Sequence, residues 1–198
     1  TAPDFSARTT LGEIRLSDLR GRWTVFFSHP ADFTPVCTSE FVALARAAAD
    51  FEAMDCVLLG LSVDSLHSHL AWVKAIRDDF GVTVPFPIIE DPSMAVARAY
   101  GMIAPDAADS SAVRATYFID PRGIVRAITW YPMTTGRSVD EMLRMVAALQ
   151  RTEDGKALTP AGWRPGDDVL KPAIADQSAL LREDEAIWFY RTAPDRSR

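Results

Sequence analysis

The amino-acid sequence predicts an α/β fold in which helices flank a mixed central sheet, followed by a C-terminal extension. Two continuous apolar runs, at 23–28 and 57–63, are typical of strands that are buried on both faces. Between them, over 37–54, apolar residues recur at the spacing of one helix face. A strand, a helix and a second strand in this order indicate two parallel strands joined by a crossover helix.

The segments that flank these runs predict further elements of the same domain. Residues 11–17 alternate in polarity around a glycine, which favours a small hairpin ahead of the first central strand. After the second central strand, Asp64 or Ser65 can cap a helix that Gly81 ends. Residues 85–89 are expected to be extended, because two prolines restrict their backbone.

The next part of the chain predicts one more helix and then a pair of strands. The helix is expected to begin at Asp91 or Ser93 and to end before a glycine. Residues 104–111 have the composition of a loop. Residues 114–120 and 124–131 then read as two antiparallel strands around a tight turn.

The last helix of the core is expected from Ser138 to about Gln150. Ser138 can cap it, and Glu141 lies three residues on, where it completes a capping box. With this helix, the order of elements is that of a thioredoxin-like fold, although the Cys-x-x-Cys of a disulfide exchanger is absent. We therefore interpret residues 1–150 as one thioredoxin-like domain.

Residues 151–198 form an extension of different composition. Prolines and glycines lie among charged residues there, which disfavours regular structure. The extension is nevertheless too apolar to be a solvated tail, so it either folds over its own core or packs against a second subunit. Its apolar residues are Trp163, Val169, Leu170, Leu180, Leu181, Ile187, Trp188, Phe189 and Tyr190.

Composition and charge exclude several classes of partner. The chain has 198 residues, is 48% hydrophobic and carries a net charge of −6, without the basic stripe that binds nucleic acid or an anionic membrane. Its apolar runs are far shorter than the roughly 20 residues that span a bilayer, and its N-terminus lacks a secretory pattern. Two cysteines make neither a disulfide framework nor a zinc site. We therefore expect a cytoplasmic protein that acts on a small molecule.

Cys37 lies where a strand-to-helix loop meets the first turn of a helix. Unpaired N–H groups at a helix start favour a thiolate over a thiol, so a reactive cysteine suits this position. Pro30 and Pro35 restrict the loop, and the Thr34 hydroxyl lies three residues before the sulfur. The third residue after Cys37 is Glu40 and not a second cysteine, so the chemistry starts from one thiolate.

The pattern Pro30-x-x-x-Thr34-x-x-Cys37 resembles the peroxidatic motif of the peroxiredoxins. Residues 27–40 as a whole are similar to the 1-Cys subgroup in particular. The similarity continues beyond this loop and covers nearly the whole chain. It includes residues 62–65, 69–72, 85–89, 114–118, 131–137 and 159–167.

This resemblance implies a thiol peroxidase that reduces hydrogen peroxide and alkyl or lipid hydroperoxides, in antioxidant defence and redox homeostasis. Cys37 would attack the peroxide and become a sulfenic acid. Thr34 corresponds to the hydroxyl that holds the peroxide, and Arg114 to the guanidinium that stabilises the thiolate and the departing oxygen. Arg137 corresponds to the second arginine of the family, in a supporting role. Because Arg114 heads an apolar strand, its charge needs partners, and Glu40 is expected to be one.

The histidines and the second cysteine leave more than one interpretation open. His29 can either hydrogen-bond to the Cys37 site or only pack beside it. His67 and His69 lie on different faces of a helix, which is poor metal geometry, so we expect no metal and no cofactor. Cys56 opens an apolar strand and is expected to pack as a small hydrophobe. The residues expected to shape and dry the pocket are Asp32, Phe33 and Phe118.

The expected partners follow from the single reactive thiol. Without a resolving cysteine, an external thiol must reduce the sulfenic acid, and glutathione, glutaredoxin and thioredoxin all remain open. The resemblance also implies that the C-terminal arm wraps around a partner in a homodimer or a higher oligomer.

Two other classes of function stay open, a thiol hydrolase and a redox-sensing or holdase protein. The phospholipase activity described for some 1-Cys relatives needs a serine where this chain has Gly21-Arg22-Trp23.

Overall fold

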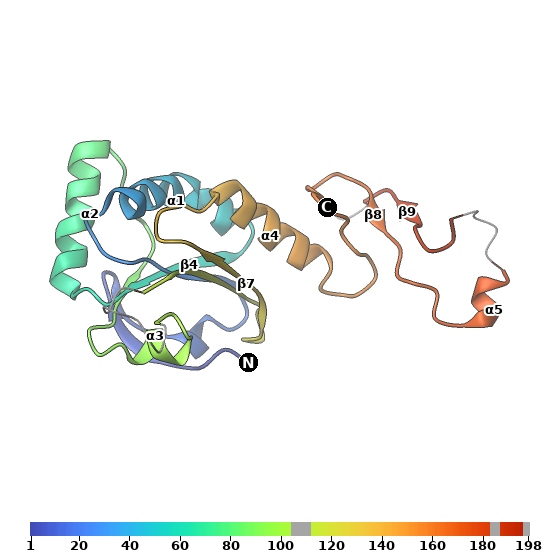
Figure 1. Ribbon diagram of the computed structural model, residues 1–198, viewed down its shortest axis with the longest axis horizontal. Helices are drawn as coiled ribbons and strands as arrows, with labels where there is room; N and C mark the ends of the chain where they lie inside the picture. The colour runs from blue at the N-terminus through green and yellow to red at the C-terminus, as the bar shows by residue number, and fades with distance from the viewer. Residues whose placement is uncertain (104–111, 183–186, 196–198) are drawn as a thin grey trace. The chain divides into compact units, whose positions relative to one another are not determined.

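The computed structural model describes residues 1–103, 112–182 and 187–195, and the chain divides into two compact units, Thr1–Val139 and Asp140–Arg198. The first unit is built on a mixed sheet (Figure 1). This sheet has seven strands in the order β2-β1-β5-β4-β3-β6-β7. Its strands, and the 3-10 helix that precedes β3, are β1 (Ser6–Thr9), β2 (Gly12–Arg15), η1 (Leu16–Leu19), β3 (Trp23–Ser28), β4 (Cys56–Ser62), β5 (Ile88–Glu90), β6 (Arg114–Ile119) and β7 (Val125–Tyr131).

β3 lies in the interior of the sheet because its residues are apolar on both faces, and all of them are buried. It pairs in parallel with β4 on one side and antiparallel with β6 on the other. These pairings confirm the two central strands and the antiparallel hairpin of β6 and β7 that the sequence predicts. The hairpin predicted ahead of β3 is also present, as β1 and β2, but it lies at 6–15 and not at 11–17.

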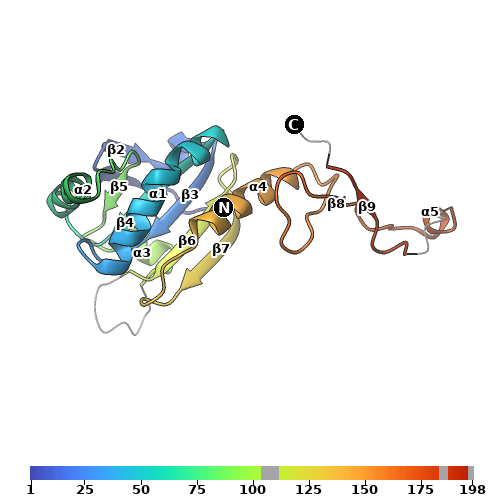
Figure 2. The ribbon, with the colours of Figure 1, turned by 90° about the horizontal axis from the view of Figure 1, so that it is seen from above.

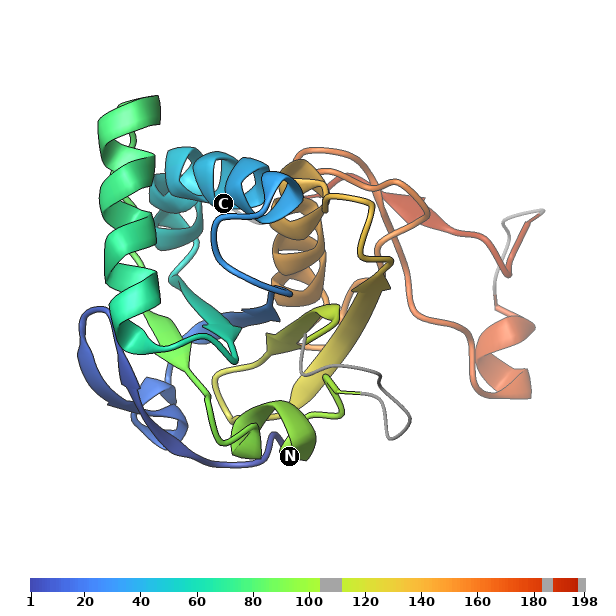
Figure 3. The same ribbon diagram turned by 60° about the vertical axis from the view of Figure 1, so that its left-hand side comes forward.

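Helices cover both faces of the sheet in the first unit (Figures 1 and 3). α1 (Pro35–Ala53) and α2 (Leu66–Phe80) lie on one face, and the short α3 (Ala95–Ala99) lies on the other. α2 begins and ends where the sequence predicts. The Ser65 hydroxyl accepts a backbone hydrogen bond from the first turn, and Gly81 ends the helix with a φ of 67°, a conformation that suits glycine.

α3 is shorter than the sequence predicts, and the expectation that it begins at Asp91 or Ser93 is wrong. The helix begins only after Met94, which has a φ of 59°. The physical reason is a turn that Asp91 holds in place. Its carbonyl accepts from the Met94 N–H at 2.8 Å, and its carboxylate accepts from the Ala97 N–H at 2.7 Å. The loop predicted at 104–111 lies outside the described residues.

Successive aromatic residues of β3 pack on opposite sides of the sheet. Phe26 belongs to the core on the α3 side, where its ring lies 4.9 Å from that of Tyr100. Phe27 packs on the other side against Phe41 of α1, with ring centroids 5.6 Å apart. Gly60 of β4 makes this close approach possible, because a Cβ atom there would lie 3.3 Å from the Phe41 ring. The packing holds α1, and with it Cys37, against the sheet.

The second unit contains most of α4 (Val139–Arg151), which confirms the predicted last helix, together with α5 (Gln177–Leu180) and a small sheet. In this sheet β8 (Val169–Leu170) pairs antiparallel with β9 (Thr192–Ala193), as Figure 2 shows. Across the described parts of both units, no helix combines the length and the apolar character that crossing a membrane requires. The core of the second unit consists of Ala148, Ala157, Trp163 and Val169.

Candidate active site

Cys37 is the third residue of α1, and its side chain is completely buried. The helix begins at Pro35, whose fixed φ suits a first helical residue, and Thr34 is the N-cap in an extended conformation. The sulfur is therefore carried on the first helical turn, where backbone N–H groups have no partner inside the helix. This is the position in the fold that the sequence predicts.

Arg114, the first residue of β6, reaches the sulfur from the sheet. Its Nη1 donates to Cys37 Sγ at 3.3 Å and to Glu40 Oε2 at 3.0 Å. Its Nε and Nη2 both donate to the Met133 carbonyl, at 3.0 and 2.9 Å. With both edges of the guanidinium engaged, Arg114 is held in one orientation beside the thiol.

Glu40 lies one helical turn after Cys37 and binds two arginines at once. Its Oε1 accepts from the backbone N–H and from Nε of Arg137, at 2.8 and 3.0 Å, and its Oε2 accepts from Nη2 at 2.7 Å. Arg137 also donates to the Ala115 carbonyl on β6, and its guanidinium lies 5.1 Å from the centre of the Phe27 ring. One carboxylate thus joins α1 to both cationic side chains.

The charges of this cluster are almost closed off from water. Arg114, Arg137 and Glu40 are 2%, 8% and 3% exposed. Two guanidiniums against one carboxylate leave a net positive charge, and low exposure makes that charge more effective than it would be in water. A site of this kind stabilises negative charge beside Cys37 Sγ.

Thr34 and Pro30 belong to the loop that precedes the thiol. The Thr34 hydroxyl donates its only proton to the Ala31 carbonyl at 2.8 Å, which leaves its oxygen lone pairs as acceptors for another group. Pro30 is buried, as expected for a rigid boundary. A groove of about 470 Å³ opens beside Thr34. Its mainly apolar lining includes Phe33, Thr34, Pro35, Trp72, Ile76 and Phe80.

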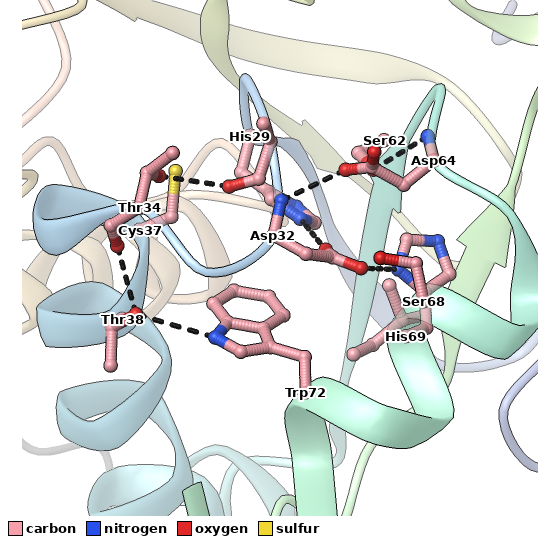
Figure 4. Close-up of polar contacts among 12 residues, drawn as sticks. His29, Asp32, Thr34, Cys37, Thr38, Ser62, Asp64, Ser68, His69 and Trp72 are labelled. Carbon is pink, nitrogen blue, oxygen red and sulfur yellow. Dashed lines mark hydrogen bonds and ion pairs between the residues drawn. The ribbon is translucent and has the colours of Figure 1, made fainter. Parts of the chain in front are cut away.

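A second buried polar cluster joins the loop to α2 (Figure 4). The two oxygens of the Asp32 carboxylate contact Nε2 of His29 at 2.8 Å and Nδ1 of His69 at 2.7 Å. Nε2 of His69 donates to the Ile89 carbonyl at 3.1 Å. Nδ1 of His29 has no hydrogen-bond partner in the described part of the chain.

Burial and hydrogen bonding shift the pKa values of this second cluster in opposite directions. Burial lowers the pKa of His29 and outweighs the hydrogen bond to Asp32 that favours its charged form. Burial disfavours ionisation of Asp32, but the hydrogen bonds from His29 and His69 outweigh it and keep the pKa of Asp32 well below its usual value. The three side chains could each offer one ligand atom to a metal, within 4.8 Å of one another. Hydrogen bonds among the three side chains already engage Nε2 of His29, Nδ1 of His69 and both oxygens of Asp32, so a hydrogen-bond network accounts for the cluster.

Cys56 lies in a different environment. It begins β4, beyond the far end of α1, and is 2% exposed. Burial raises the pKa of Cys56 to about 12, so this residue is a neutral thiol near pH 7. These properties fit the predicted role of Cys56 as a small buried hydrophobe.

The structure brings together Cys37, Glu40, Arg114 and Arg137, with Thr34 at the same helix start. Sequence reasoning missed the Met133 carbonyl, because a backbone acceptor leaves no trace in residue type. It also treated His69 only as a poor metal ligand and Asp32 and Phe33 only as pocket-shaping residues. Asp32 also bonds to two histidines. Phe33 is 59% exposed and lines the groove beside Thr34, as a pocket-shaping residue does. A signal for His69 was present, since Trp72 lies three residues later on the same helix face and both are buried.

Two family models match the chain. The model described as the AhpC/TSA family matches residues 1–128, and the model described as the C-terminal domain of 1-Cys peroxiredoxin matches residues 148–186. Among curated relatives, peroxiredoxin 2 of Caldanaerobacter subterraneus subsp. tengcongensis is 52% identical over 86% of this chain and 77% of its own length. Peroxiredoxin 2 of Thermoplasma acidophilum is 46% identical over 92% of this chain and 91% of its own length.

Two solved structures are similar over nearly the whole chain. A yeast mitochondrial 1-Cys peroxiredoxin, described with its thiol resolving mechanism via glutathione/thioredoxin systems, has a TM-score of 0.87 and 39% identity, and the match covers 98% of this chain and 97% of that one. Peroxiredoxin 6 of Arenicola marina has a TM-score of 0.86 and 33% identity, with 98% and 96% covered.

Replacing Glu40 with alanine should lower the free energy of unfolding by about 3–5 kcal/mol, because two buried guanidiniums lose the carboxylate that compensates them. Urea unfolding followed by circular dichroism measures the change. Asp78→Ala is the matched control, since it removes the acid of an exposed pair with Lys74 and should leave the midpoint within experimental error. Equal midpoints for the Glu40 variant and its parent would show that the buried pairs do not stabilise the fold.

Proposed function

The chain belongs to the AhpC/TSA family, the peroxiredoxins, and we propose that it reduces hydroperoxides through Cys37 as its single redox-active thiol. The family is one of thiol peroxidases. The observation that carries the assignment to Cys37 is its contact with Arg114, whose Nη1 lies 3.3 Å from the sulfur inside a buried, net positive cluster. Cys56 has no comparable cationic partner among the described contacts and is held as a neutral thiol.

The proposed reaction is a displacement at one oxygen of the peroxide. The Cys37 thiolate attacks that oxygen, an S–O bond forms as the O–O bond breaks, and the second oxygen departs and takes a proton as water or an alcohol. Cys37 becomes a sulfenic acid, so the sulfur is oxidised and the peroxide is reduced. Thr34 is suited to accept a hydrogen bond from the peroxide, since its own proton is bound to the Ala31 carbonyl. Arg114 is suited to stabilise negative charge on the departing oxygen.

Charge balance explains why the cluster contains two arginines. Glu40 alone would repel a thiolate and a developing oxyanion. With Arg114 and Arg137 both bound to Glu40, the thiolate completes a set of two positive and two negative charges. We propose a supporting role for Arg137, because it holds Glu40 and so leaves part of the Arg114 guanidinium available to the sulfur. For Pro30 we propose that its ring keeps the loop ahead of the thiol rigid.

An external thiol is needed to reduce the sulfenic acid. The sequence has two cysteines, and α1 separates Cys37 from the start of β4, where Cys56 lies, by about 24 Å along its axis. A disulfide needs Cα atoms within roughly 7 Å, so the two cannot pair in this fold. We propose glutathione, glutaredoxin or thioredoxin as the reductant. The yeast structural relative is described with glutathione and thioredoxin systems, which supports that range.

The apolar groove beside Thr34 supports organic hydroperoxides as substrates in addition to hydrogen peroxide. It has the size and lining to receive an alkyl chain whose peroxide group lies next to Thr34.

A thiol hydrolase would need a histidine base at the sulfur. The described hydrogen bond of the His29 ring goes to Asp32 instead, so the geometry supports a peroxidase better. A holdase would keep its function without Cys37, and the first test below separates that class.

We also propose that the chain forms a homodimer through the C-terminal extension, residues 151–198, and acts in the cytoplasm. The support for a dimer is a set of large apolar side chains in the second unit that its small core does not cover. These are Leu181, Ile187, Trp188, Phe189 and Tyr190.

Cys37→Ser should abolish peroxide turnover, whereas Cys56→Ser should leave it largely intact, because only Cys37 contacts Arg114. The measurement is peroxide consumption by the purified protein with glutathione, a glutaredoxin system and a thioredoxin system supplied in turn. Mass spectrometry after trapping with dimedone should place the sulfenic acid on Cys37. Equal loss of turnover in both variants would contradict the single-thiol mechanism.

Arg114→Ala should slow peroxide reduction by about 10²-fold even at a pH where the thiol is fully ionised, because a donor to the departing oxygen is lost. Arg114→Lys should restore the thiolate fraction more than the rate, since an ammonium keeps the charge but not the planar fork. Thiolate absorbance against pH and single-turnover peroxide reduction separate the two effects. An alanine variant that reacts as fast as the parent once ionised would limit Arg114 to stabilising the thiolate.

Replacing Trp188 and Phe189 together with serine should shift the protein from dimer towards monomer, because both side chains are exposed apolar surface in the second unit. Light scattering at matched concentrations measures the shift. Leu11→Ser is the control, since Leu11 is 63% exposed on the hairpin of the first unit and should leave the mass unchanged. A double variant with the mass of the parent would remove these residues from the interface.

A further inference from the structure

The groove beside Thr34 follows one face of helix α2. Residues three, four, seven and eight positions after Trp72 line it together with Trp72 itself, and residues at this spacing share a helix face. Seven helical residues advance by about 10 Å, so the groove extends by this length from Trp72 to Asp79. The α2 residues of the lining are Trp72, Ala75, Ile76, Asp79 and Phe80.

The two ends of this groove differ in depth. At the inner end, Trp72 is 1% exposed, and its indole donates to the Thr38 hydroxyl at 3.3 Å (Figure 4). That hydroxyl donates in turn to the Thr34 carbonyl at 2.8 Å. At the outer end, Phe80 is 51% exposed. An organic hydroperoxide whose peroxide group lies next to Thr34 would therefore place the far end of its chain near Phe80.

The outer end of the groove carries a negative charge that the protein does not compensate nearby. Among the described residues that line the groove, Asp79 alone is charged, and it is exposed. Within the described part of the chain, Asp79 forms no ion pair. The cations of the same stretch of α2, Lys74 and Arg77, both pair with Asp78 instead. A ligand in the groove therefore meets a free carboxylate and no free cation of this helix segment.

The stability of α2 does not explain an aspartate at position 79. The helix ends at Phe80, and the last carbonyl groups of a helix give its C-terminus a partial negative charge. A carboxylate at this end is unfavourable for the helix unless a cation compensates it, as Lys74 and Arg77 do for Asp78. Asp79 and the helix C-terminus together make the potential at the outer end of the groove negative.

We propose that Asp79 is a specificity-determining residue: the groove accepts the chain of an uncharged organic hydroperoxide and disfavours a chain that ends in a carboxylate. The inference rests on the proposed peroxidase function and names the substrate class of that site. An uncharged chain end would contact the apolar surface of Ile76 and Phe80. A carboxylate in the same place would be repelled by Asp79 and by the helix C-terminus. Alkyl hydroperoxides and esterified lipid hydroperoxides are therefore favoured over the hydroperoxides of free fatty acids.

The test uses two probes that differ only in the charge at the far end of the chain, ω-hydroperoxyoctanoic acid and its methyl ester. Single-turnover rate constants are measured for both and divided by that for hydrogen peroxide, which has no chain to reach residue 79. The parent should react about threefold faster with the ester than with the acid, the size of effect that exposed charges have on each other. Asp79→Asn should bring this ratio close to one. Asp79→Lys should invert it, and a helix C-terminus tolerates lysine.

Asp50→Asn is the matched control, because it removes the same charge from an exposed position outside the groove. Asp50 lies eleven residues after Ser39 on α1, about 17 Å farther along the axis, which exceeds the screening length of about 10 Å at 0.1 M salt. The control should therefore keep the ester-to-acid ratio of the parent. Raising the salt concentration to about 1 M should lower that ratio in the parent, because exposed charges are then screened.

Binding of inert analogues separates this inference from the proposed function. Methyl octanoate should shift the Trp72 indole N–H resonance at a lower concentration than octanoate does, and Asp79→Asn should remove the difference. Selective binding of the ester by a protein that consumes no hydrogen peroxide would support the inference and remove the proposed function. Hydrogen peroxide turnover with equal rates for the two probes in the parent would overturn the inference and leave the function intact. A preference for the ester that Asp79→Asn leaves unchanged would also overturn it.

Discussion

The site depends on one carboxylate, that of Glu40, shared between two buried arginines. Glu40 comes from α1, Arg114 from β6, and Arg137 from the segment that follows β7, so a single acidic group fixes three parts of the first unit. Removing these charges from water costs several kcal/mol per ion, which only close and multiple hydrogen bonds can offset. The distances of 2.7–3.0 Å between Glu40 and the two guanidiniums meet that condition. A hydrophobic cluster of the same volume would be cheaper to bury but would offer no charge to a sulfur.

The same carboxylate sets the electrostatic state beside Cys37. If Arg114 were the only arginine bound to Glu40, the two charges would cancel, and little net positive charge would act on the thiol. Arg137 changes this balance without touching the sulfur in any described contact, because it shares the carboxylate. The Met133 carbonyl adds orientation and no charge, so the guanidinium of Arg114 is fixed while its positive charge stays available. Positioning and charge are thus supplied by different groups, which is why one site needs so many residues.

Local sequence patterns predicted the strands, helix ends and loop that are determined by residues close together in the chain. Continuous apolar runs located β3 and β4, the Ser65 cap and Gly81 bounded α2, and the loop motif placed Cys37 on the first turn of α1. The predicted start of α3 was wrong because the Asp91 side chain holds a turn. From residue type alone, an aspartate in such a turn cannot be told from an aspartate that caps a helix. Contacts between residues that are far apart in the chain left weaker signals in the sequence. The Met133 carbonyl left none, and the contact of His69 with Asp32 spans 37 residues and becomes visible only when α2 packs beside the loop.

Burial of the thiol imposes opposite demands on a peroxidase that relies on an external reductant. A closed, water-poor site strengthens the charges that act on a small peroxide, yet it excludes the larger thiol that must follow. The Glu40 cluster lies on the sheet side of the sulfur and is joined by buried ion pairs. The loop side is attached through the hydrogen bonds of Asp32 to His29 and His69, and it contains Phe33 with a φ of 55°. The charges beside Cys37 therefore come from the sheet side, whereas the lone pairs of the Thr34 hydroxyl come from the loop side, so a small oxidant bound between them would meet a donor and an acceptor at once.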